Sequence, residues 1–206
     1  MTPELILAIA DRIGVFVFAI SGGILAVRKD MDLLGVITLA FLPAIGGGTL
    51  RDLILGVDVF WLPDSSVILL AIAGGLTAFL FHRFVEEFKP LRWADAFGMA
   101  LFAVAGAAKT IALGHGFFVV LIMGAMTASA GGLMRDVVAN VDPLLLKTDI
   151  YATAALLAAL VYFLMVALGA PELAAFGAGI LAGFTLRGAA IVFGLSLPKP
   201  PGGRRE

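Results

Sequence analysis

The sequence predicts an all-α integral membrane protein with seven transmembrane helices, built as an inverted-topology repeat of three plus three helices followed by a seventh helix. Three observations support this prediction. The 206 residues are 61% hydrophobic and have a mean hydropathy of +1.08, whereas a soluble domain is about 45–50% apolar. The apolar residues form seven long segments, and the two halves of the chain repeat each other at a fixed spacing. This composition excludes a soluble enzyme.

Each predicted span is long enough for a bilayer, which needs about 20 mainly apolar residues at about 1.5 Å of rise each. Turn and charge signals separate the spans, such as Arg28-Lys29-Asp30 and Leu62-Pro63-Asp64. The first apolar run continues to Val27 and is too long for a cleaved signal peptide. The predicted spans are Leu5–Val27, Leu33–Leu55, Val67–Phe84, Trp93–Leu113, Phe117–Val138, Ile150–Leu168 and Leu173–Leu195.

Lysine and arginine residues outside the spans predict the orientation of the chain. Nine of them fall on one side of the membrane, and the segments on the other side hold none. Because basic loops stay in the cytosol, we expect the N-terminus outside and the C-terminus in the cytosol. The nine residues are Arg28, Lys29, Arg83, Lys89, Arg92, Lys147, Lys199, Arg204 and Arg205.

The internal repeat has an offset of 84 residues, which relates Gly46-Gly47-Gly48-Thr49-Leu50-Arg51-Asp52 to Ala130-Gly131-Gly132-Leu133-Met134-Arg135-Asp136 (131 minus 47, 135 minus 51). The same offset relates Asp11 to Asp95 and Phe18 to Phe102. Each repeat holds three spans, so the second copy enters the membrane from the opposite side. We expect one membrane domain over residues 1–206, with repeats at about 5–84 and 89–168, a seventh helix at about 173–195 and a cytosolic tail at 196–206.

The glycine clusters mark the second and fifth spans as kinked and interrupted helices, because consecutive glycines lower the cost of a bend. Carbonyl groups freed at membrane depth face protein or a water-filled cavity, where they can coordinate a cation. The alternative is that the glycines only allow close helix packing, and that nearby hydroxyls bond back to their own helix. The candidate pore and kink residues are Gly46, Gly47, Gly48, Thr49, Ser129, Gly131 and Gly132.

Charged residues within the spans form the second candidate set, since such residues at bilayer depth are costly and usually functional. Adjacent helix positions point about 100° apart, so the Arg and Asp of each motif are not expected to face each other. Asp11 and Asp95 are the expected partners of the motif arginines, by symmetry and each from the other repeat, with the motif acids Asp52 and Asp136 as the alternative. The alternative is a structural ion pair, or, for Lys109 and Arg187, a side chain that extends to the interface. The candidate gating residues are Asp11, Arg12, Arg51, Asp52, Asp95, Lys109, Arg135 and Asp136.

Several functions find no support in the sequence. The chain has no cysteine and only two histidines, His82 and His115, which do not form a metal-ligand spacing. No catalytic triad or nucleotide-binding loop is present, and the basic residues are dispersed, so we expect no enzyme, no metal, no cofactor and no nucleic-acid partner.

The doubled Gly-Gly-x-x-Arg-Asp motif in a topology of three plus three plus one spans resembles the prokaryotic trimeric intracellular cation (TRIC) channel family, over nearly the whole chain. The resemblance implies a homotrimer with one pore in each protomer, permeable to monovalent cations, potassium and sodium, with a preference for potassium. It also implies that the two glycine motifs kink their helices around the pore. The Lys-Glu-Val signature of the animal members is missing here, so their regulation is not expected. Bacterial relatives of this domain have also been labelled glycine transporters.

Two functions of different class follow from these features. The first is a cation channel of the prokaryotic inner membrane, surrounded by lipid, with an hourglass pathway between the repeats. The second is a secondary transporter of a small zwitterion such as glycine, because inverted repeats with broken helices are typical of transporters and paired Arg and Asp side chains suit a carboxylate and an ammonium. A membrane scaffold without transport activity is disfavoured by the charges within the spans.

Overall fold

The computed structural model describes residues 3–81, 90–146 and 150–197. The predicted end of the third span at Phe84, the basic residues Arg83, Lys89 and Lys147, His82, and residues 198–206 of the tail lie outside the described residues. Within the described ranges the chain forms seven helices: α1 (Pro3–Arg28), α2 (Leu33–Leu55), α3 (Ser65–Leu80), α5 (Pro90–Ala112), α6 (Phe117–Val138), α7 (Ala152–Ala167) and α8 (Glu172–Phe193).

Local capping explains where several helices begin and end. The Asp32 side chain accepts a hydrogen bond from the Gly35 N–H (2.8 Å) and starts α2. Gly56, with a φ of +67°, ends the same helix in the left-handed conformation that glycine adopts without strain. Asp64 caps α3 by accepting the Ser66 N–H at 2.9 Å.

Five of the helices are long and apolar enough to cross a membrane, by length and composition. The other two, α3 and α7, have 16 residues each and therefore span about 24 Å, less than the hydrocarbon core of about 30 Å. Helix α7 is shorter than the predicted span Ile150–Leu168, because apolar composition continues beyond the residues that are helical. Both α3 and α7 are the third helix of a repeat.

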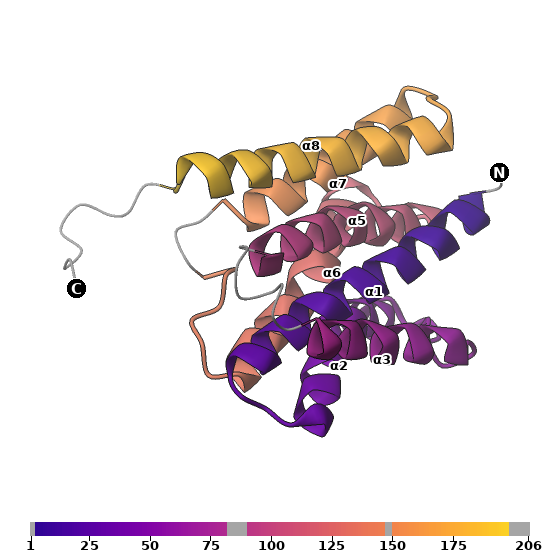
Figure 1. Cartoon of the computed structure of the whole chain (residues 1–206). Helices are drawn as coiled ribbons and strands as arrows, with labels where there is room; N and C mark the ends of the chain where they lie inside the picture. The colour runs from indigo at the N-terminus through magenta and orange to yellow at the C-terminus, as the bar shows by residue number, and fades with distance from the viewer. Residues whose placement is uncertain (1–2, 82–89, 147–149, 198–206) are drawn as a thin grey trace.

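The helices form two units of three that pack against each other (Figure 1). Within each unit the first helix packs on the second and third, so that α1, α2 and α3 are matched by α5, α6 and α7. The units meet where α1 packs on α5 and α2 packs on α6. In each of these pairs the two helices are equivalent, so each pair lies on the two-fold axis that relates the units. The predicted seventh helix, α8, lies outside the repeat and packs on α7 and α5.

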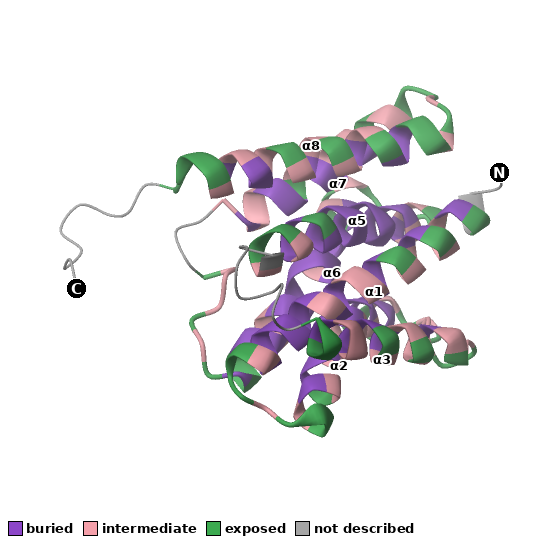
Figure 2. Ribbon diagram, in the orientation of Figure 1, coloured by how far each residue is buried: buried purple, intermediate pink, exposed green. Residues whose placement is uncertain are grey.

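Helix α5 lies at the centre of the bundle, in contact with α1, α6, α7 and α8. Residues 98–108 are buried almost without interruption, and they are mostly alanine and glycine. Figure 2 shows this concentration of buried surface on α5 and on the faces of its neighbours that turn toward it. Small side chains let helix backbones approach closely in a membrane, so the composition of α5 suits its central place.

Reciprocal contacts between α1 and α5 show the symmetry at the level of side chains. A Cβ on Gly98 would stand 2.8 Å from the ring of Phe18, and the Gly14 position lies in the same way against the ring of Phe102. The two phenylalanine rings lie 5.1 Å apart between centroids. Each pair is related to the other by the 84-residue offset found in the sequence (98 minus 14, 102 minus 18).

Candidate functional site

The two glycine clusters meet where α2 crosses α6. A Cβ on Gly131 would stand 2.7 Å from the carbonyl oxygen of Pro43, and a Cβ on Gly47 would stand on the carbonyl oxygen of Thr127. These contacts are reciprocal, since Pro43 and Thr127 are also related by the offset (127 minus 43). The backbones of the two helices therefore touch, as the close-packing alternative requires. Gly132 differs, because the nearest atom to its added Cβ would be 3.6 Å away.

The expected interruption of the second and fifth spans is wrong. Both α2 and α6 are continuous α-helices through their glycine clusters. Gly47 and Gly131 are used for contact between backbones, and their peptide groups remain in the helix. A bend of the helix axes at Gly47 and Gly131 remains a prediction.

Hydroxyl groups near the crossing bond back to their own helices. Thr49 Oγ1 donates to the Ile45 carbonyl (2.7 Å), and Ser129 Oγ donates to the Ala125 carbonyl (2.7 Å). Sequence reasoning missed Pro43, which lies within α2 and removes the N–H that would bond the carbonyl of Leu39. A proline within a predicted span is the signal that could have located this break in the helical hydrogen bonds.

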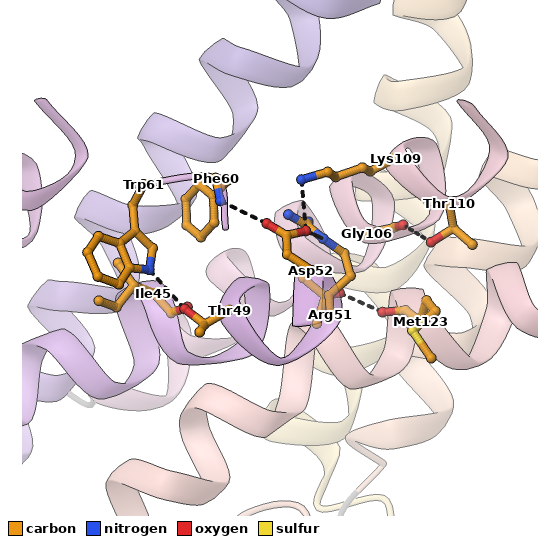
Figure 3. A network of polar contacts seen from close by, with 11 residues as sticks. Ile45, Thr49, Arg51, Asp52, Phe60, Trp61, Gly106, Lys109, Thr110 and Met123 are labelled. Atoms are coloured by element: carbon orange, nitrogen blue, oxygen red, sulfur yellow. Dashed lines mark hydrogen bonds and ion pairs between the residues drawn. The ribbon is translucent and has the colours of Figure 1, made fainter. Parts of the chain in front are cut away.

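The first charge cluster is built on Asp52 near the end of α2 (Figure 3). It is here called the outer cluster, and its counterpart the inner cluster, after the sides of the membrane that the sequence predicts for them. Asp52 Oδ1 accepts hydrogen bonds from Arg51 Nε (2.7 Å) and Lys109 Nζ (2.8 Å). Its other oxygen accepts the Phe60 N–H (2.9 Å), and the Arg51 guanidinium lies 5.8 Å from the Phe60 ring centroid. Arg51 and Asp52 are buried, and the side chain of Lys109 keeps 21% of its surface exposed.

The second charge cluster, here called the inner cluster, is built on Asp136 near the end of α6. Asp136 Oδ1 accepts a hydrogen bond from Arg135 Nε (2.8 Å), and Asp136 Oδ2 accepts the Leu144 N–H (2.9 Å). Arg135 Nη1 also donates to Asp95 Oδ1 (2.6 Å) and to Ser21 Oγ (2.5 Å). The Arg135 and Asp95 side chains are 0% and 1% exposed, so this cluster is closed to solvent.

The prediction that the Arg and Asp of each motif do not face each other is wrong. The divergence of about 100° applies to the Cβ directions, whereas the arginine side chain is long enough to curl back over its neighbour. In both clusters a loop N–H, from Phe60 or Leu144, also holds the carboxylate from the far side. Phe60 and Leu144 are related by the same offset (144 minus 60), so the repeat could have identified them.

Among the expected partners, Asp95 binds a motif arginine, but this is Arg135 of its own repeat and not the arginine of the other repeat. Its counterpart Asp11 is placed where the charges of Arg51 and Lys109 act on it, but no ion pair joins Asp11 to Arg51 within the described part of the chain. Lys109 from α5 binds the outer cluster instead.

Two further predictions about charged residues are wrong. Arg12 does not join either cluster, because its Nη2 pairs with Asp64 Oδ2 at 2.5 Å, where both side chains are partly exposed. Arg187 does not extend to the interface, because it is 1% exposed and its guanidinium lies over the ring of Tyr151, 5.1 Å from the centroid.

The clusters are arrangements of buried charge. Within the described ranges no three His, Cys, Asp or Glu side chains gather to hold a metal ion. Each cluster places a buried carboxylate and a buried guanidinium near the end of a helix that enters the glycine crossing. Such groups can attract, repel or block an ion, and they can hold the two ends of a zwitterion.

Comparison with known proteins identifies the family. The sequence model of the family described as "Glycine transporter" matches twice, at residues 8–83 and 92–167, and both bounds differ by the 84 residues of the repeat (92 minus 8, 167 minus 83). A UPF0126 membrane protein of Vibrio cholerae is 36% identical over 200 residues, which cover 94% of this chain and 82% of that protein. The UPF0126 inner membrane protein YadS of Escherichia coli K12 is 36% identical over 157 residues, which cover 74% of this chain and 75% of that protein.

A solved structure agrees with these sequence matches. The TRIC trimeric intracellular cation channel orthologue from Rhodobacter sphaeroides superposes with a TM-score of 0.86 at 37% identity, covering 92% of this chain and 99% of that one. The doubled family match, the relatives and the superposition over nearly the whole length agree, so this chain is a multi-pass membrane protein that belongs to the prokaryotic branch of the TRIC family, which the family description calls "Glycine transporter".

Proposed function

We propose that this chain is a cation channel, and not an enzyme, in which each protomer has its own pathway between the two repeats. The observation that carries the proposal is the superposition on a cation channel over 92% of the chain with a TM-score of 0.86 at 37% identity. The preference for potassium over sodium rests on the resemblance alone.

The geometry suggests where the pathway runs and what closes it. The outer cluster and the inner cluster lie near the ends of α2 and α6, and the two helices touch between them at Gly47 and Gly131. In this conformation an ion has no room to pass between the two backbones, so conduction requires α2 and α6 to separate there. Lys109 is suited to be the movable part of the outer cluster, because its ammonium binds Asp52 from another helix and its side chain is 21% exposed.

We propose a homotrimer in the inner membrane, with the N-terminus outside and the C-terminus in the cytosol. The trimer is supported by the trimeric Rhodobacter orthologue. The inner membrane is supported by the description of the Escherichia coli relative. The orientation is supported by the nine basic residues on one side of the predicted spans.

The second candidate function is a secondary transporter of glycine or a similar zwitterion. The family description supports it, and so does the pairing of buried arginine and aspartate side chains in both clusters. A transporter must expose its site to the two sides in turn, which limits its turnover, whereas a channel needs one continuous opening.

Flux into liposomes distinguishes the two functions. Purified protein is reconstituted, and the dissipation of a potassium gradient is followed with a voltage-sensitive dye, beside the uptake of labelled glycine. A channel gives rapid potassium flux that does not change when glycine is present on either side. Saturable glycine uptake, together with no potassium flux when glycine is absent, would reject the channel and support the transporter.

A further inference from the structure

Arg187 is a buried charge on the helix that lies outside the repeat. It belongs to α8, and its residue is 1% exposed. A charged side chain buried in a membrane protein is costly and usually has a defined partner and purpose. The two charge clusters described above account for the motif arginines, but they leave Arg187 without a role.

Arg187 binds the segment that enters α7. Its guanidinium carbon lies 5.1 Å from the centroid of the Tyr151 ring, a cation–π distance. Its Nη1 also donates to the Ile150 carbonyl at 3.4 Å. Tyr151 is itself 2% exposed, so the two side chains meet away from water, where such a contact is strongest.

The other end of Tyr151 reaches the inner cluster. Its hydroxyl oxygen lies 3.6 Å from the point where a Cβ on Gly132 would stand, and Asp95 Oδ1 and Arg135 Nη2 lie 3.6 and 3.7 Å from the same point. Three polar atoms from α5, α6 and Tyr151 therefore converge on one glycine. The space beside them, which Ser129 also lines, is too small to hold a water molecule.

Helix α8 also contacts α5 on both sides of Asp95. The Phe184 ring lies 5.9 Å from the Trp93 ring and 5.8 Å from the Phe97 ring, between centroids. Gly188 allows the helix to approach Trp93, because an added Cβ would stand 3.2 Å from the indole. A movement of α8 would therefore disturb both Tyr151 and the turn of α5 that carries Asp95.

Among the described residues, this link is present at the inner cluster and has no counterpart at the outer cluster. The offset relates Tyr151 to Val67 (151 minus 67), which has neither a hydroxyl nor an aromatic ring. The inner cluster is thus connected to α8 through Tyr151, and the outer cluster has no equivalent aromatic residue at the related position.

We propose that Arg187 is a positioning residue that acts through Tyr151: it couples α8 to the inner cluster and holds that cluster closed. The proposal rests on the proposed function in one respect, since the inner cluster is taken as an end of the pathway. Arg187 touches no permeating species itself. Its contribution is to fix the ring whose hydroxyl borders Asp95 and Arg135.

A thiol reporter tests the coupling without any measurement of transport. The chain has no cysteine, so Ser129→Cys introduces a single thiol beside the closed space. The rate at which a water-soluble methanethiosulfonate reagent modifies this thiol is measured in nanodiscs, where both faces are accessible. The reporter is combined with Arg187→Gln, Arg187→Lys and Tyr151→Phe. The matched control is Tyr162→Phe, which removes another bond between α7 and α8, from the Tyr162 hydroxyl to Glu172 (2.5 Å), away from the cluster.

Loss of the cation–π contact is expected to raise the modification rate about threefold to thirtyfold in Arg187→Gln. Tyr151→Phe raises it as well, Arg187→Lys lies between Arg187→Gln and the parent, and Tyr162→Phe leaves it unchanged. The proposal would be overturned if folded Arg187→Lys and Tyr151→Phe protein were modified at the rate of the parent. It would also be overturned if Tyr162→Phe raised the modification rate as much as Tyr151→Phe does, or if the thiol reacted in no variant until the protein was denatured. Raised rates in a protein that carries no potassium flux would retain the coupling and reject the channel.

Discussion

Arg135 shows how a buried charge is tolerated at membrane depth. Its side chain is 0% exposed, and it is bound by Asp95, Asp136 and Ser21. Removing a charge from water costs more than a single contact returns, so a buried ion needs several hydrogen-bonded partners. For the same reason, removing one charged member of the cluster is expected to lower the stability of the protein more than neutralising both members of an ion pair.

Replacement of Arg135 by methionine tests this dependence. Arg135→Met leaves two carboxylates uncompensated and is expected to lower the free energy of unfolding by about 3–5 kcal/mol, measured by thermal or denaturant unfolding in detergent. Arg135→Met combined with Asp95→Asn should recover part of the loss, because one buried negative charge is removed as well.

The control for this change is Arg12→Met. Arg12 and Asp64 are paired with side chains that are 43% and 34% exposed, and exposed pairs contribute at most about 1 kcal/mol. An equal loss in Arg12→Met and Arg135→Met, or a double variant less stable than Arg135→Met alone, would contradict the account of the inner cluster.

Asp64, in the loop before α3, is expected to give the protein a dependence on acid pH. Hydrogen bonding by Ser66 and the charge of the Arg12 guanidinium hold the pKa of Asp64 below its ordinary value of 3.8. A folded-state pKa below the unfolded one stabilises the protein at pH above the unfolded value, and this contribution is lost as the pH falls from about 3.8 through the folded value. The difference in stability between the parent and Asp64→Asn should be constant from neutral pH to about pH 4 and should shrink below it. A difference that grows on acidification would contradict the assignment.

At the residue scale the sequence predicted that Asp95 binds a motif arginine, and it favoured partners on other helices over the aspartate within each motif. The ion pair of Asp95 with Arg135 joins α5 to α6 within the second repeat, whereas the prediction placed the partner acid of each arginine in the other repeat. The contact of each arginine with the next aspartate depends on side-chain conformation, which helical spacing alone does not determine. Tyr151 was missed because its role depends on Arg187, which lies outside the repeat.

At the scale of elements, the crossing of α2 and α6 is a point where the backbones of the two repeats are in direct contact. Gly131 lies against the backbone of Pro43, which cannot move aside as a side chain can. The next residue, Gly132, has ordinary space for a methyl group. Substitutions at these two neighbouring glycines therefore distinguish the effect of close helix packing, which acts at Gly131, from the general effect of glycine on helix stability, which acts at both.

Alanine substitution at these neighbours is expected to have opposite effects. Gly131→Ala should destabilise the protein by about 1–3 kcal/mol, because the methyl group forces the helices apart. Gly132→Ala should be neutral or stabilising by up to about 1 kcal/mol, because alanine favours a helix over glycine. The melting temperatures of the two variants in the same detergent give the comparison. Similar values for both would show that α2 and α6 are not in backbone contact.

The positions of helices were predicted better than their continuity. The predicted spans Leu33–Leu55 and Phe117–Val138 have the bounds of α2 and α6, because capping and turn residues flank both apolar runs. The predicted interruption failed because consecutive glycines serve equally to bend a helix and to let another helix approach, and only the neighbouring helix decides between these uses. The length of α7 was overestimated because composition does not show where an apolar chain leaves the helix.

At the scale of the whole molecule, two similar units meet about a two-fold axis, and their differences concern charge. The outer cluster contains Lys109, which the offset relates to Leu25 (109 minus 25). The inner cluster contains Ser21 and adjoins Tyr151, with α8 behind it. We expect the partly exposed Lys109 to be released more readily than any member of the inner cluster, so the proposed pathway opens first at the outer cluster.

The central claim is that cations pass through each protomer along a pathway that the outer cluster guards. It is tested most directly by single-channel recording of purified protein in planar bilayers with potassium as the permeant cation, for the parent and for Lys109→Gln. The account predicts unitary current steps in both, with a higher open probability in Lys109→Gln, because the loss of the ammonium removes a contact that holds Asp52. Folded protein that gives no unitary steps in either form would contradict the claim.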